Sequence, residues 1–104
     1  MTVKLLKSGE ALAHVLDRLS DALEMNVTAD SAVLLAKFIV KNAAVSGTSA
    51  QQSDRMIAVA QFQGIAFQAV VTKDGVVTVF PMTNYSGKFM SIDDAISVVS
   101  DRIK

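Results

Sequence analysis

The chain has 104 residues, with ten basic and ten acidic side chains and a formal net charge of zero. This length predicts a single domain, residues 1–104, with one hydrophobic core. The absence of cysteine excludes a disulfide framework and any thiolate metal site, and a single histidine leaves no ligand cluster. We therefore expect no metal and no cofactor.

Apolar residues make up 51% of the chain, and the mean hydropathy is +0.39. Both values are high for a small soluble domain, so we expect an exposed apolar patch that serves a homo-oligomer or another protein partner. No apolar run approaches the roughly 18 residues of a membrane span. Charged residues follow the first methionine too closely for a signal peptide, which predicts a cytoplasmic protein without membrane contact.

Two helices are predicted in the N-terminal part, after a short extended arm or edge strand over residues 2–6. Ser8 is typical of an N-cap, and the helix after it is expected to end near Met25. Thr28 is the next N-cap, and the second helix spans residues 29–42. That helix is apolar nearly all round, so we expect it to lie between layers or to contact another chain. Apolar residues at helical spacing mark the first helix, namely Leu12, Val15, Leu16, Leu19 and Leu23.

A β-meander is predicted between Arg55 and Pro81. Its strands are 55–62, 65–72 and 76–80, joined by turns at Gln63-Gly64 and at Lys73-Asp74-Gly75. The first strand is apolar on both faces, which is typical of a central strand or of one that contacts a partner.

The flanking segments complete the predicted fold. Residues 44–54 are small and polar, which predicts a flexible segment, part of which could form a fourth strand with its turn near residues 46–49. Residues 82–90 are expected to form a loop, and Ser91 to cap a third helix over residues 92–104. The order predicts an α+β fold with two N-terminal helices, a three- or four-stranded antiparallel meander and a C-terminal helix, the helices lying on one face.

The loop after the last strand offers ligand candidates in Asn84, Tyr85 and Lys88, because loops at strand ends often hold ligand contacts. The alternative is an ordinary connection that Tyr85 and Phe89 anchor to the core. We prefer this second interpretation.

His14 and Arg18 are the residues most suited to catalysis. They are four residues apart, so they project from one side of the first helix. A histidine beside an arginine can act as acid or base while the arginine neutralises a phosphate, which metal-free RNA cleavage requires. Glu10, His14 and Arg18 also form a charged ladder typical of a solvated helix face, and the residues alone favour that interpretation.

The chain resembles the broad superfamily of RelE-like toxins and barnase-like nucleases, which includes phage- and plasmid-borne members. The resemblance covers residues 14–81 and depends on His14-Val15-Leu16-Asp17-Arg18, on Phe67-Gln68-Ala69-Val70-Val71, and on Val76-Val77-Thr78-Val79-Phe80-Pro81. It implies a metal-independent ribonuclease with His14 as acid or base, Arg18 and Arg55 on phosphate, and Thr78 as a hydrogen-bonding support. The family's second arginine is replaced by Ala22, and its polar residues on the middle strands by Gln68 and Ala69.

Two functions follow from these patterns. The first is a small interaction or accessory protein that works as a homo-oligomer or binds a protein partner, with Phe38, Met56 and Phe62 at the interface. The second is the ribonuclease-like activity that the resemblance implies. The near-zero net charge argues against strong RNA binding, and the incomplete catalytic pattern favours the interaction protein.

Overall fold

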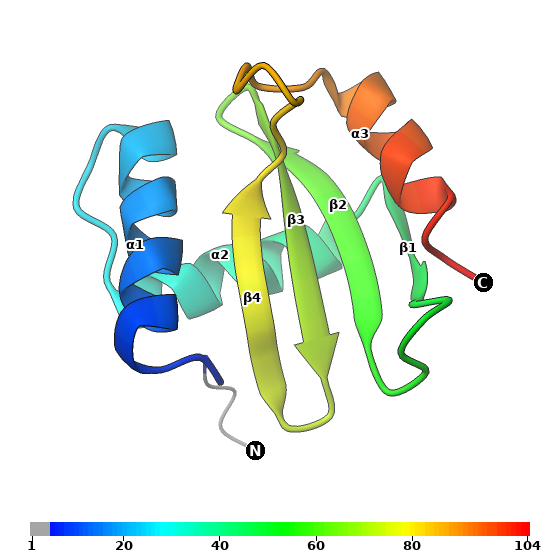
Figure 1. Cartoon of the computed structure of the whole chain (residues 1–104), viewed down its shortest axis with the longest axis horizontal. Coiled ribbons are helices and arrows are strands. Elements are labelled where there is room, and N and C mark those ends of the chain that lie inside the picture. The colour runs from blue at the N-terminus through cyan, green and yellow to red at the C-terminus, as the bar shows by residue number, and fades with distance from the viewer. Residues whose placement is uncertain (1–4) are drawn as a thin grey trace.

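The computed structural model describes residues 5–104 and has three helices and a four-stranded sheet (Figure 1). The predicted α+β fold is confirmed. No helix in the described part is long and apolar enough to cross a membrane. The elements in chain order are α1 (Gly9–Leu23), α2 (Ala29–Lys41), β1 (Val45–Thr48), β2 (Met56–Phe62), β3 (Ile65–Thr72), β4 (Gly75–Pro81) and α3 (Ile92–Ser100).

The sheet is an antiparallel meander in the order β1-β2-β3-β4. The β2–β3 hairpin closes through Gln63 and Gly64, which both have positive φ (52° and 78°), as a two-residue turn between twisted strands requires. Between β3 and β4 the register shifts at Val70 and Val71, so β4 carries one extra residue there.

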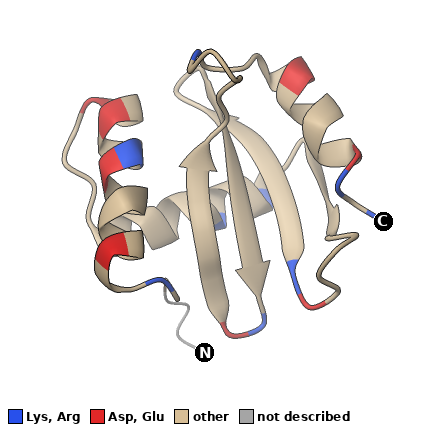
Figure 2. Cartoon of the chain, viewed as in Figure 1, with Lys and Arg blue, Asp and Glu red and all other residues tan. Residues whose placement is uncertain are grey.

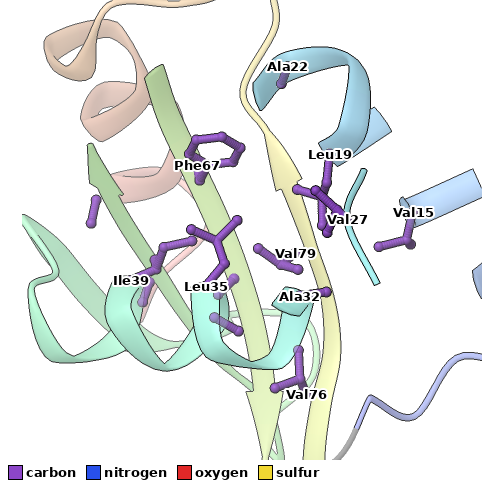
Figure 3. Close-up of a cluster of buried hydrophobic side chains, with 14 residues drawn as sticks. Val15, Leu19, Ala22, Val27, Ala32, Leu35, Ile39, Phe67, Val76 and Val79 are labelled. Atoms are coloured by element: carbon purple, nitrogen blue, oxygen red, sulfur yellow. The ribbon is translucent and has the colours of Figure 1, made fainter. Parts of the chain in front are cut away.

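One face of the sheet is covered by α1 and α2. Even-numbered residues of β2 and odd-numbered residues of β3 point to this side, and those in the middle of the strands are buried, namely Ala58, Ala60, Phe67 and Ala69. Figure 3 shows Leu35 and Ile39 of α2, Leu19 of α1 and Phe67 of β3 within this cluster. The cluster joins all the described elements except β1 and α3, and is the larger of the two in the protein.

The opposite face is covered by α3. Ile57 and Val59 of β2 point to this side and pack with Ala95 and Val99 of α3 in a second cluster. In Figure 1, α2 lies behind the sheet and α3 lies in front of it, over the β1–β2 side. The expectation that all helices lie on one face was therefore wrong. Because β2 is apolar on both sides, it needs a covering layer on each.

The N-caps predicted at Thr28 and Ser91 are confirmed by hydrogen bonds. Thr28 Oγ1 accepts a hydrogen bond from Ser31 N at 3.2 Å, and Ser91 Oγ accepts one from Asp94 N at 3.1 Å. Ser8 begins α1 without a side-chain cap. The two N-caps that close a hydrogen bond precede the helices with the most apolar sequences.

The fourth strand predicted within residues 44–54 is confirmed as β1, which pairs with β2, so this segment is not flexible throughout. Two predicted boundaries were wrong. The turn that reverses the chain lies at residues 49–55 rather than 46–49. The third helix ends at Ser100, and Ile103 then bridges Ser49 instead of continuing the helix. The arm predicted over residues 2–6 lies mostly outside the described residues, although Leu5 forms a parallel bridge with Val76.

Gly47 is required by the contact between β1 and the C-terminal segment. A Cβ atom at this position would overlap Ile103 Cγ2 and lie 3.5 Å from Ile103 Cβ. We expect Gly47→Ala to lower the free energy of unfolding by about 1 to 3 kcal/mol, the usual cost of overpacking a well-packed contact. Urea denaturation measures this change.

Ser46→Ala is the matched control, since Ser46 is the exposed neighbour on the same strand. Adding Ile103→Ala to Gly47→Ala should remove the clash, so the double variant should lose less stability than the sum of the single losses. Strict additivity would show that the overlap is not what constrains Gly47.

Candidate functional site

A groove lies on the α3 side of the sheet, over β3 and β4, beside the area that α3 covers. It consists of two adjoining cavities with volumes of about 460 Å³ and 250 Å³. Phe80 lines the larger cavity, and Gln68, Val70 and Thr78 line the smaller one. Gln68 pairs with Phe80 and Val70 with Thr78 across the two strands, so these four side chains form one continuous floor, hereafter the groove floor.

The charged residues that line this groove are all basic. Lys7, Arg55 and Arg102 line the smaller cavity, and Arg18 and Arg102 line the larger one. All three arginines of the chain therefore line the groove. Among residues 5–104, no Asp or Glu lines either cavity. In Figure 2 the lengths of β3 and β4 carry no charged residue, so the positive charge comes from surrounding segments.

Arg18 reaches this groove from a helix that packs on the opposite face. Its guanidinium carbon lies 5.5 Å from the centre of the Phe80 ring, and its Nη2 donates a long hydrogen bond of 3.4 Å to the carbonyl oxygen of Pro81. A cation over an aromatic ring is held by the negative face of the ring. These contacts place the Arg18 guanidinium at the β4 edge of the groove.

Gln68 is the unusual residue of the groove floor. Its side chain is only 4% exposed, and Oε1 has no hydrogen-bond partner within the described part of the chain. Val59 and Phe80 flank it on the neighbouring strands, and neither side chain can donate a hydrogen bond. A buried acceptor left unpaired costs free energy, which makes Gln68 a candidate ligand contact.

The structure brings together three of the four predicted catalytic residues. Arg55 and Thr78 line the smaller cavity, and Arg18 lines the adjoining larger one. His14 is exposed on α1 and lines neither cavity. Sequence reasoning did not select Arg102. Nothing in the sequence around Arg102 indicates that the C-terminal segment returns to the end of β1, and this return is what brings Arg102 to the groove.

The loop after β4 is held by hydrogen bonds to the side chain of Asn84. Asn84 Oδ1 accepts hydrogen bonds from Ser86 N at 2.9 Å and from Lys88 N at 3.1 Å. Asn84 and Tyr85 line the larger cavity, whereas Lys88 does not. The expectation that Tyr85 and Phe89 anchor this loop to the core was wrong, because Tyr85 is fully exposed and Phe89 is 53% exposed.

A second surface lies on the α2 side of the sheet. Met25, Leu34 and Phe38 are 54%, 65% and 40% exposed, and Phe62 stacks on Phe38 edge to face with ring centres 5.2 Å apart. These four residues, hereafter the α2 surface, border a cavity of about 270 Å³ that is lined almost entirely by apolar atoms. Met56 lies at the other end of β2, so the predicted interface unites Phe38 and Phe62 without it.

Comparison with known proteins gives no assignment. No protein family, no curated protein and no solved structure matches the chain. Within residues 5–104, no group of His, Cys, Asp or Glu is arranged to hold a metal ion. The groove and the α2 surface are therefore the features of the protein that bear on its function.

The unpaired Gln68 oxygen gives a prediction about stability. Gln68→Met keeps an unbranched side chain of similar length and removes the unpaired acceptor. We expect the free energy of unfolding to rise by about 1 kcal/mol or more, the usual penalty of an unsatisfied buried polar group. Chemical denaturation measures the change, with the exposed Gln61→Met on β2 as the control, which should change little. A Gln68→Met variant less stable than wild type would show that the amide has a stabilising partner.

Proposed function

We propose that this protein is a small interaction protein that associates with a second copy of itself through the α2 surface. The observation that carries this proposal is the 65% exposure of Leu34 next to the half-exposed Phe38 and Met25. A cluster of large apolar side chains around an apolar cavity gains free energy when water is excluded from it.

The charges on α2 support pairing with a second copy. Leu34 is at the centre of the exposed side of α2, with Asp30 one turn before it and Lys37 and Lys41 one and two turns after it. A two-fold axis near Leu34 would align two α2 helices antiparallel. Each Asp30 would then face the lysines of the other copy, and the two helix dipoles would oppose one another favourably.

Leu34→Glu tests this proposal. At a two-fold interface the substitution places two like charges in apolar surroundings, so we expect the dimer dissociation constant to rise by more than about 100-fold. Light scattering after size-exclusion chromatography should give a dimer for wild type and a folded monomer for the variant. Phe38→Glu should act in the same direction.

Phe89→Glu is the matched control, because Phe89 is similarly exposed but lies in the loop after β4. The antiparallel arrangement has its own test. Asp30→Lys alone should weaken the dimer, and adding Lys41→Asp should restore it, since opposite charges would again face each other. A monomeric wild type at 100 to 200 µM, or a dimer that Leu34→Glu leaves intact, contradicts the proposal.

A second candidate function is the ribonuclease-like activity, because Arg18, Arg55 and Thr78 line one groove. Among residues 5–104, no imidazole and no carboxylate lines the groove for proton transfer, since His14 lies outside it. We therefore expect no cleavage of a fluorogenic RNA in EDTA above the rate of a blank, and no difference between wild type and His14→Ala. If wild type cleaves the RNA and Arg55→Met abolishes the cleavage, the ribonuclease-like activity would be preferred over self-association.

A further inference from the structure

We propose that the groove over β3 and β4 is a binding site for a small phosphate ester that carries hydroxyl groups. The proposal does not depend on self-association, because the groove lies on the α3 side of the sheet and the α2 surface on the other. It depends on three features: the basic walls, the unpaired Gln68 oxygen of the groove floor, and the size of the cavities.

The walls supply the contacts for the phosphate. Lys7, Arg18, Arg55 and Arg102 come from four separate segments, and they all line the same groove. Guanidinium groups match phosphate oxygens with two parallel hydrogen bonds, and the absence of lining carboxylates among the described residues leaves the positive charge uncompensated there. An anion would relieve the repulsion among these cations.

The groove floor supplies the contact for a hydroxyl. Gln68 lines the smaller cavity together with Arg55, Arg102 and Thr78, and its Oε1 atom is buried and unpaired among the described residues. An amide oxygen accepts hydrogen bonds, so it needs a ligand that donates one, which a phosphate dianion does not. A ligand that satisfies both the arginines and Gln68 carries an anionic group and a hydroxyl donor.

The size of the groove favours a small molecule over a nucleic-acid strand. The volumes of about 460 Å³ and 250 Å³ are of the order found for small-molecule sites. The formal net charge of zero gives the protein no long-range attraction for a polyanion. The local basic groove still attracts one phosphate group at short range, and Phe80 of the groove floor and Met90 offer apolar contacts to the rest of the ligand.

Titration followed by ¹H–¹⁵N NMR tests the site. The ligands are ribose 5-phosphate, inorganic phosphate, uncharged ribose and a short single-stranded RNA, each added to the wild-type protein. We expect ribose 5-phosphate to bind with a dissociation constant below about 1 mM, inorganic phosphate more weakly, and ribose not at all. The shifts should concentrate on β3, β4, the Gln68 side-chain amide and the arginine Nε–H signals.

Three variants separate the contacts. Arg102→Met should weaken both phosphate ligands by about tenfold or more, as expected for the loss of a charge-assisted contact. Gln68→Met should weaken ribose 5-phosphate and leave inorganic phosphate unchanged. Lys73→Met is the matched charge control, since Lys73 is exposed at the β3–β4 turn and lines neither groove cavity. It should bind like wild type.

The titrations test the groove independently of self-association. Absence of shifts on β3 and β4 with 10 mM inorganic phosphate and 10 mM ribose 5-phosphate overturns the proposal, and so does equal weakening by Lys73→Met and Arg102→Met. Binding of the RNA without binding of the small phosphates also overturns it. The same titration of Leu34→Glu should give wild-type affinity, so failure of the groove and failure of self-association are distinguished.

Discussion

Strand β2 packs against a layer on each face, and the need to cover both of its faces determines how the other elements are arranged. Side chains alternate along a strand, so Ala58 and Ala60 face one layer while Ile57 and Val59 face the other. The first layer is made by α1 and α2. The second is made by α3 alone, which has nine residues and is about 14 Å long, whereas a seven-residue strand is about 23 Å long.

The short α3 helix explains the groove. It covers the β1–β2 side of its face, so the part over β3 and β4 remains accessible. The surrounding segments then form the walls: Arg18 crosses the β4 edge from the other layer, and Arg102 follows the end of α3. Because Ile103 bridges Ser49, the C-terminal segment also fixes the connection that carries Arg55. The groove thus depends on contacts between segments that are far apart in the sequence.

The sequence predicted those features whose cause is local. The positive φ at Gly64 and the caps at Thr28 and Ser91 depend on neighbouring residues, and these hairpin and helix starts were found. The apolar side of α3 was also found, but amphipathicity does not say which sheet face a helix covers. The two apolar faces of β2 indicate either a central strand or a strand that contacts a partner, and only the packing of Ile57 and Val59 on α3 decides between these alternatives. Gln68 was interpreted as a lost catalytic position, because its burial and its unpaired oxygen depend on Val59 and Phe80 across the sheet.

The α2 surface and the groove lie on opposite sides of the same sheet, which has a consequence for the proposed dimer. If α2 pairs with α2 of a second copy, each sheet lies between the interface and its own groove, so both grooves face outward. Ligand binding would then leave the interface contacts in place. The cost of an unpaired acceptor at Gln68 is also separated from the apolar contacts of Phe38 and Phe62, which favours independent effects of substitutions in the two surfaces.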